Sequence, residues 1–389
     1  MGPSIEYLVS SPDGDISADK NKWHLPLECD TLKTPYKIYF NSIREFLVRD
    51  DLKLLLEAIS RKLGRKIHLK EVNKIIVRSE KHGFLYHPAS IEVILNPVRK
   101  EGGEAGLSKR VKFGLNVAIS GVGKDCLREE FSILKRLNKK FNLPYLPEPY
   151  FLGELNAMSF LLEDWFEGYH EFHICKDEEG KQRLKLWDFD SGYKYLSSGQ
   201  GFELYKQASK ILTLYYDFID FSQIYPWHHA AGDFVVKIPP HPPFPKGGEG
   251  GLDVRLTTVR RYEPLIVLKD KDPVNPFLGL FYFFLNITTR MRLDKLDGLG
   301  EVVWADDTCL EAAVAGFLEA LKLKEELKDY IGSVEEFLGL LKSFGEEELK
   351  ITFNSIIDLY TGEEDLPVLI ENLDEHVRKL YAILQILPL

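Results

Sequence analysis

The sequence of 389 residues contains few cysteines, and their spacing is not that of a metal or disulfide motif. The four cysteines, Cys29, Cys126, Cys175 and Cys309, occur singly, without a CxxC pair. This pattern indicates neither a zinc site nor a disulfide framework, and it favours a reducing cytoplasmic location. The first residues also lack the basic and then apolar order of a secretion signal.

Long apolar runs and clusters of basic residues are scarce as well. The most apolar stretch, PFLGLFYFFLNI at 276–287, is well short of the roughly 20 residues needed to span a bilayer, so we expect a buried helix there and no membrane partner. The net charge is -10, and no segment is dominated by Lys and Arg. A nucleic-acid partner is therefore not expected, which leaves small molecules or proteins.

Glycine is concentrated in two similar segments, KEGGEAGL at 100–107 and PKGGEGGL at 245–252. Such stretches favour solvated loops. A phosphate-binding loop would require a helix directly after it, whereas each segment precedes a strand-like run. We interpret them as two copies of one inserted element, near 97–108 and 239–252, with phosphate binding as the alternative.

The periodicity of apolar residues changes from strand-like to helical along the chain. Apolar residues at spacings of three and four predict a helix first, then strands, a second helix and two further strands before an exit near Glu167 and Gly168. Helical patterns dominate after residue 202. This segregation predicts an α+β protein in two lobes. The expected parts are an N-terminal helical extension at 1–72, a β-rich lobe at 73–168 and a helical lobe at 169–389.

The order of these elements over 73–266 resembles the protein-kinase-like fold, in particular its aminoglycoside and choline phosphotransferase branch. The shared order is three strands, a helix, two strands, an apolar linker, a long helix and a loop with an aspartate. The resemblance implies a two-lobed kinase-like fold, with a small antiparallel β N-lobe and a larger helical C-lobe. It also implies ATP and Mg²⁺ as cofactors.

The motif HGDxxxxN of those families is partly matched by AAGDFVVKI, which places Gly232 and Asp233 in register with GD. The resemblance implies that Asp233 orients or deprotonates an acceptor hydroxyl or holds the metal. Ala231 stands at the histidine position and Ile238 at the asparagine position. Nearby, His229 is a candidate acid-base partner, and the alternative is a neutral histidine bonded to a backbone carbonyl in a packed turn.

The expected nucleotide-binding groups are also altered. Asn116 stands where the families carry a lysine, with Glu130 available on the following helix as its partner. An amide donates a hydrogen bond but brings no charge, so phosphate affinity through this position should be reduced. Lys81 and His82 lie at the tip of the first hairpin, where the families cover the phosphates.

A polar cluster follows the apolar helix in RMRLDKLDGLG at 290–300. Arg290 or Arg292 could hold an anionic group of the cofactor, while Asp294 or Asp297 could hold a cation. The alternative is an internal salt-bridge cap, because Arg290 and Asp294 lie four residues apart and would pair on a helix.

Three functions remain open. The first is an atypical phosphotransferase that moves a phosphoryl group from a nucleotide to a small hydroxylated acceptor. Because three of the four usual polar groups are altered, the second is a non-catalytic, pseudokinase-like nucleotide-binding or regulatory module. The third is a helical protein-interaction scaffold with a small β domain. The sequence does not indicate an oligomeric state.

Overall fold

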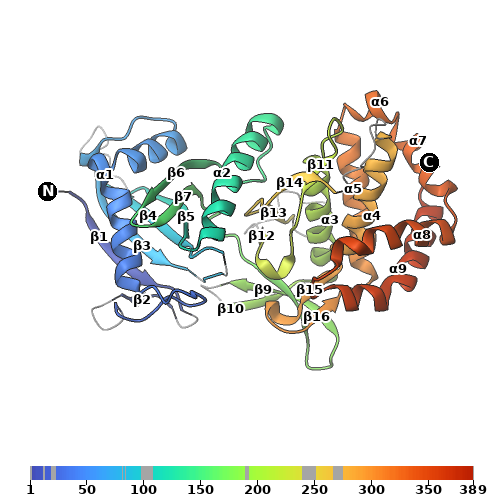
Figure 1. Ribbon diagram of the computed structural model, residues 1–389, viewed down its shortest axis with the longest axis horizontal. Helices are drawn as coiled ribbons and strands as arrows, with labels where there is room; N and C mark the ends of the chain where they lie inside the picture. The colour runs from blue at the N-terminus through green and yellow to red at the C-terminus, as the bar shows by residue number, and fades with distance from the viewer. Residues whose placement is uncertain are drawn as a thin grey trace. The chain divides into compact units, whose positions relative to one another are not determined.

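The computed structural model describes residues 2–11, 14–18, 23–80, 82–83, 85–97, 108–188, 192–238, 251–265 and 275–388. Most of both expected inserts lies outside this part of the chain. The protein is a mixed α+β structure (Figure 1). It divides into two compact units: unit 1 comprises Met1–Asn142 and Pro147–Glu167, and unit 2 comprises Leu143–Leu146 and Gly168–Leu389.

Unit 1 is built on a seven-stranded sheet with the order β2-β1-β3-β4-β5-β7-β6. Strand β1 runs parallel to β3, and the other neighbouring strands are antiparallel. The strands are β1 (Ser4–Val9), β2 (Ile16–Ser17), β3 (Val72–Ser79), β4 (Ala89–Leu95), β5 (Arg110–Ala118), β6 (Pro149–Leu155) and β7 (Met158–Asp164). Residues 1–72 are therefore more than the expected helical extension, since they add two strands to this sheet.

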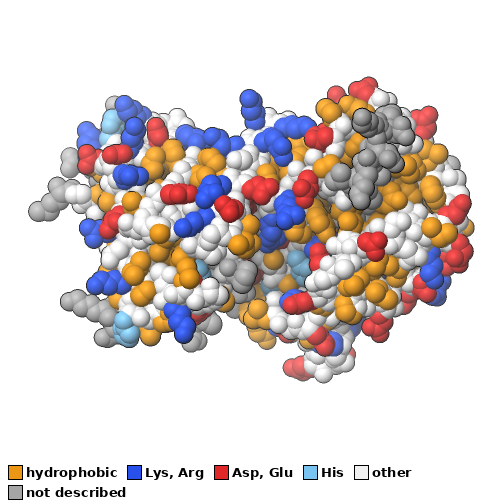
Figure 2. Space-filling model, in the orientation of Figure 1, with side chains coloured by type: hydrophobic (Ala, Val, Ile, Leu, Met, Phe, Trp, Pro, Cys, Tyr) orange, Lys and Arg blue, Asp and Glu red, His pale blue; other side chains and the backbone are white. Residues whose placement is uncertain are grey.

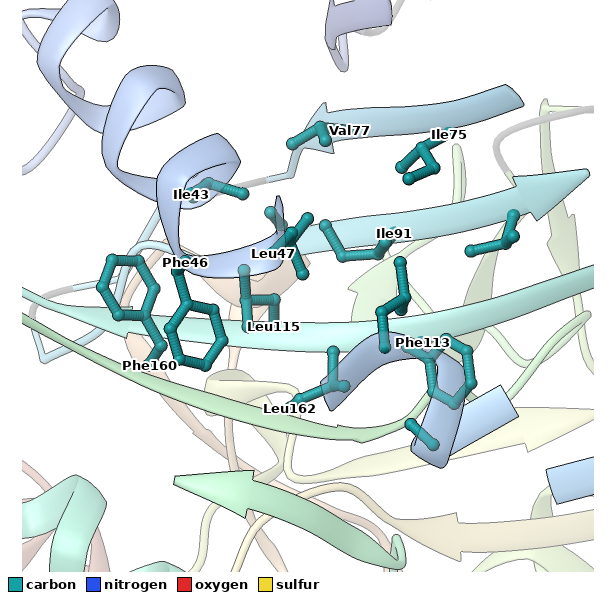
Figure 3. Packing of buried hydrophobic residues seen from close by; sticks show 14 of the residues in the cluster. Ile43, Phe46, Leu47, Ile75, Val77, Ile91, Phe113, Leu115, Phe160 and Leu162 are labelled. Carbon is teal, nitrogen blue, oxygen red and sulfur yellow. The ribbon is translucent and has the colours of Figure 1, made fainter. Parts of the chain in front are cut away.

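Helix α1 (Tyr36–Leu63) supplies much of the core of unit 1. Figure 3 shows Ile43, Phe46 and Leu47 of this helix packed against apolar side chains of the sheet. Phe46 stacks on Phe160, with ring centroids 4.6 Å apart. The sequence predicts one continuous helix, but its geometry is interrupted at residues 49–52, three of which have positive φ.

Helix α2 (Gly121–Phe141) connects β5 to β6, and a short 3-10 turn, η1 (Leu69–Glu71), leads into β3. Ser120 begins α2 by accepting a hydrogen bond from the backbone of Gly123, and Asn142 ends it in the left-handed conformation. The capping residues and the apolar spacing explain why the sequence predicts this helix well.

Unit 2 begins with a three-stranded antiparallel sheet of the order β10-β9-β8 and continues with three separate strand pairs. The sheet contains β8 (Phe172–Lys176), β9 (Gln182–Asp188) and β10 (Gly192–Tyr195). The pairs are β11 (Ser222–Ile224) with β14 (Tyr262–Pro264), β12 (Phe234–Lys237) with β13 (Asp253–Leu256), and β15 (Leu293–Lys295) with β16 (Val302–Trp304). Short 3-10 turns are η2 (His229–Ala231), η3 (Leu296–Gly298) and η4 (Asp358–Tyr360).

Helices form the rest of unit 2. The predicted apolar helix is confirmed as α4, in which Leu280, Phe281 and Phe284 are fully buried. Helices α3 and α5 pack closely where Gly316 meets the backbone of Lys206. The helices are α3 (Ser198–Leu214), α4 (Pro276–Arg290), α5 (Asp307–Leu323), α6 (Leu327–Tyr330), α7 (Val334–Ser343), α8 (Glu346–Ile357) and α9 (Leu366–Ile386).

Candidate functional site

Asp233 follows the turn η2 and directly precedes β12. Its side chain is fully buried and is held by Arg260 through two hydrogen bonds, from Nη1 to Oδ2 at 2.5 Å and from Nη2 to Oδ1 at 2.6 Å. The backbone N–H of His228 donates to Oδ2 as well, at 2.8 Å. Both carboxylate oxygens are therefore engaged, in the bidentate geometry typical of a strong arginine-carboxylate pair.

Arg260 lies in the segment between β13 and β14, and its side chain is 28% exposed. Thr257, at the start of this segment, donates a hydrogen bond to the carbonyl of Gly232 at 3.0 Å, which fixes the segment against the turn. Sequence reasoning did not identify Arg260 as a site residue. The available signal was general: a buried carboxylate requires a cation, and two arginines follow β13.

His229 is enclosed by aromatic side chains and does not pair with Asp233. Its ring packs against the rings of Phe172, Tyr205 and Phe234. The Nε2 atom lies 3.2 Å from the carbonyl oxygen of Met291. Burial lowers the pKa of His229 to about 4, so the ring is neutral at neutral pH and donates to this carbonyl. This is the packed-turn alternative of the sequence analysis.

His228 is the neighbouring histidine; one of its ring nitrogens is hydrogen-bonded, and the other lies beside a carboxylate. Nδ1 accepts a hydrogen bond from the backbone of Ala230 at 3.0 Å, and Nε2 lies 3.4 Å from Oδ1 of Asp365. Burial alone would raise the pKa of Asp365, but hydrogen bonding to His228 and the charge of Arg290 lower it. His228 therefore has no ring nitrogen available as a general base in this arrangement.

Arg290, at the end of α4, connects three parts of unit 2. It donates to the carbonyl of Trp227 at 2.7 Å and pairs with Glu363 at 3.1 Å, while its guanidinium lies over the rings of Tyr225 and Tyr360. The expected pair with Asp294 does not form, because the helix ends at Arg290. The contacts of Arg290 are therefore structural, because they connect the end of α4 to Trp227 and Glu363.

Arg292 and Asp294 are also engaged by their surroundings. Arg292 donates twice to the carbonyl of Ala305, at 2.9 and 2.7 Å, and pairs with Asp307 at 3.1 Å. Asp294 is fully buried in β15, where it accepts a hydrogen bond from the backbone of Ile174 at 2.9 Å. Its carboxylate also lies 3.7 Å from His173.

Asp297 pairs with Lys185 at 2.5 Å, so the expected metal ligands Asp233, Asp294 and Asp297 each have a different cationic neighbour. Within the described ranges, no group of three or more His, Cys, Asp or Glu side chains is arranged to hold a metal ion. The structure does not bring the three aspartates together.

In unit 1, Asn116 donates a hydrogen bond to Oε1 of Glu163 at 2.8 Å. Glu130 of α2 is also fully buried, and its charge acts on Glu163. Burial, and then the charge of Glu130, raises the pKa of Glu163 well above its ordinary value. Sequence reasoning missed Glu163, although an acidic residue inside the apolar strand MSFLLED was a usable signal.

Of the two candidates at the tip of the first hairpin, Lys81 lies outside the described residues and His82 lies within them. His82 is buried, with Nε2 at 2.8 Å from Oγ of Ser79 and Nδ1 at 2.9 Å from Nδ1 of His87. Burial lowers the pKa of His82 to about 4, so the two rings share one hydrogen bond in their neutral forms. Tyr39 adds a hydrogen bond to the carbonyl of His87 at 2.9 Å.

Two open hollows of the described surface lie elsewhere. One of about 830 Å³ is lined by the second half of α1 and by η1, including Leu56, Arg61 and Ile67. The other, of about 350 Å³, is in unit 2 and includes Arg292 and Lys379. Of the sequence-predicted site residues, Arg292 alone lines either of these two hollows.

Comparisons with known proteins do not show a family. No family model matches the chain. A curated protein described as sodium-dependent nutrient amino acid transporter 1, from Drosophila persimilis, is 24% identical over 126 residues, which are 31% of this chain and 18% of the transporter. The match thus covers under a fifth of that protein's length. Among the described residues, no helix has both the length and the apolar character needed to cross a membrane.

Proposed function

We propose that the chain is a kinase-like binding or regulatory module that does not transfer a phosphoryl group. The observation that carries this proposal is the buried ion pair of Asp233 with Arg260. A general base must reach the proton that it removes, and an aspartate with both oxygens bonded inside the protein does not.

The kinase-like part of the proposal is supported by element order within each unit. In unit 1, five antiparallel strands follow the order β3-β4-β5-β7-β6, with α2 inserted between β5 and β6. In unit 2, α3 precedes β11, and Asp233 lies between β11 and the β12-β13 pair. This is the order on which the resemblance to the phosphotransferases depends. The three strands β8 to β10 are an addition before α3.

The absence of turnover is further supported by the chemistry around Asn116. At the position of the family's lysine, this chain has an amide that donates a hydrogen bond to the buried Glu163. A neutral amide beside a protonated carboxyl supplies no positive charge for a phosphate. We therefore expect any ATP binding in unit 1 to be weak without Mg²⁺ and stronger with it.

A phosphotransferase acting on a small hydroxylated acceptor is the second candidate. The observation in its favour is that Arg260 is 28% exposed, so the pair could open toward solvent and a Mg²⁺ ion could replace the guanidinium at Asp233. A cytoplasmic location would suit either candidate, since all four cysteines are free thiols.

A thermal-shift screen with ATP, GTP and ADP, each with and without Mg²⁺ or Mn²⁺, tests nucleotide binding, because a ligand of the folded state raises the melting temperature. ATP turnover is then measured for the protein and for Asp233→Asn. The proposal predicts a metal-dependent shift without turnover. Turnover that is lost in folded Asp233→Asn would support the phosphotransferase instead. No shift with any nucleotide would favour the interaction scaffold.

A further inference from the structure

One face of the β8-β9-β10 sheet carries three exposed aromatic rings. Trp187 lies directly opposite Tyr193, and Tyr195 lies opposite Lys185, so these side chains share one face of the sheet. Trp187 is 37% exposed, Tyr193 57% and Tyr195 42%. The centres of the two tyrosine rings are 5.7 Å apart, in an edge-to-face arrangement with the ring planes at 71°. We call Trp187, Tyr193 and Tyr195 the aromatic platform.

The part of the same face that lies on β8 is covered, and the aromatic platform is not. His173 of β8 lies opposite Lys185, and Cys175 lies opposite Arg183, and both β8 side chains are buried. The turn η3 packs on them, because a Cβ on Gly298 would come within 2.7 Å of Nε2 of His173. The fold thus covers the β8 part of this face, whereas the three platform rings on β9 and β10 are exposed.

Cations lie over the rings but do not give the platform a net charge. Lys185 lies 5.0 Å from the ring centre of Trp187 and 5.2 Å from that of Tyr193, and Arg183 lies 5.4 Å from that of Tyr195. Each cation also has an acidic neighbour: Lys185 pairs with Asp297 at 2.5 Å, and Arg183 lies 3.8 Å from Asp177. Two positive and two negative groups therefore balance.

We propose that the aromatic platform binds a neutral glycan through the faces of its pyranose rings. The C–H groups on a sugar face are slightly positive and are attracted to the electron-rich face of an aromatic ring. The hydroxyl groups around the sugar edge can bond to the charged side chains between the rings. This inference does not depend on the function proposed above.

The charge balance decides among the possible occupants. A single-stranded nucleic acid also stacks on aromatic rings, but it needs a basic groove along its phosphates, and here each cation has an acidic neighbour. An apolar protein surface would have to bury Lys185 and Asp297 together with the rings, which is costly. A neutral ligand with both an apolar face and hydroxyl groups meets neither difficulty.

The test is calorimetric titration of the full chain with cellohexaose, chitohexaose, maltohexaose and xylohexaose, and with oligo-deoxythymidine for comparison. At least one glycan should bind with a dissociation constant of about 1 mM or tighter. Trp187→Ala and Tyr193→Ala should each weaken that binding about tenfold or more, whereas Trp187→Phe should retain most of it.

Tyr330→Ala is the matched control, because Tyr330 is 38% exposed in unit 2 but lies on α6, outside the platform. It should bind the glycan as the unmodified chain does. Circular dichroism of each variant establishes that it is folded, and Tyr195→Ala replaces any variant that is not. The inference is overturned if no glycan binds, if binding survives loss of the platform rings, or if the oligonucleotide is the ligand that these variants lose.

Discussion

Several buried polar side chains in this chain are hydrogen-bonded to partners in their own unit. Asp233 and Arg260 are one example, Asn116 with Glu163 is a second, and the hydrogen bond between His82 and His87 is a third. Burying a polar group is costly unless its hydrogen bonds are satisfied, so such groups stabilise the fold only while complete. Residues that look catalytic in the sequence therefore have structural partners here.

Glu163→Gln should stabilise the protein near neutral pH. The raised pKa means that the folded state holds a proton that the unfolded state has released, so stability falls as pH rises above the ordinary value of 4.5. A neutral amide of the same shape removes this cost, and we expect a gain of at least about 1 kcal/mol. Urea unfolding at several pH values measures it.

The matched control is Glu57→Gln, since Glu57 lies exposed on α1. It should leave the unfolding free energy almost unchanged. A loss of stability in Glu163→Gln at neutral pH would contradict a raised pKa of Glu163 in the folded state.

The stability of the protein should fall as pH decreases below the ordinary histidine pKa of 6.5. His229 has a pKa of about 4 in the folded state because it is buried, so the unfolded state binds protons first. Its contribution is fully present above pH 6.5 and is lost as pH falls toward about 4. Between about pH 7 and pH 5, the unfolding free energy of His229→Phe should therefore fall by about 2 kcal/mol less than that of the unmodified chain.

His24→Ala serves as the comparison, because His24 is exposed in unit 1. Its unfolding free energy should follow that of the unmodified chain across the same pH range. If His229→Phe and the unmodified chain lose stability equally, His229 is not held neutral as described.

At the scale of elements, glycine sets the closest helix packing in unit 2. A Cβ on Gly316 of α5 would collide with the backbone carbonyl of Lys206 on α3. Gly316→Ala should therefore force the two helices apart and cost about 2 kcal/mol or more. Chemical denaturation monitored by circular dichroism measures this loss.

Gly339→Ala is the matched control, and it should raise stability where Gly316→Ala lowers it. Gly339 lies in α7, where a Cβ would meet nothing within 4 Å. Alanine has the higher helix propensity, so this variant should be about 1 kcal/mol more stable. Equal effects of the two substitutions would contradict the packing described for α3 and α5.

Elements with a strong local signal could be predicted from the sequence. Helix α2 has a serine cap and regular apolar spacing, and α4 is almost wholly apolar. The interruption of α1 could not be predicted, because Asp50, Asp51 and Leu52 adopt positive φ without glycine. Strand β1 was missed because its pairing with β3 joins segments far apart in the sequence.

Pairing between segments far apart in the sequence also limits prediction of the candidate site. The sequence marks Asp233 as unusual, yet its partner Arg260 is 27 residues away and reaches it only through the β12-β13 pair. Arg290 and Asp294 were expected to pair as helix neighbours, but the helix ends between them. Local spacing identifies polar residues in such cases, whereas tertiary pairing determines their partners.

At the scale of the whole molecule, acidic charge is concentrated toward the C-terminus. Residues 301–389 contain 20 Asp and Glu against 7 Lys and Arg, a net charge of -13, whereas residues 1–300 have a net charge of +3. Figure 2 shows side chains of both signs on the visible face. The acidic excess disfavours strong attraction to polyanions. This agrees with a partner that is recognised by local chemistry, as proposed for the aromatic platform.

The central claim is that Asp233 serves the fold as the partner of Arg260. A double-mutant cycle tests it most directly, with Asp233→Asn, Arg260→Gln and the combined variant unfolded in urea. We predict that the two single variants are strongly destabilised and that the coupling energy is about 2 kcal/mol or more. Effects that add to within about 0.5 kcal/mol, with Asp233→Asn alone nearly neutral, would contradict the claim and leave Asp233 available for chemistry.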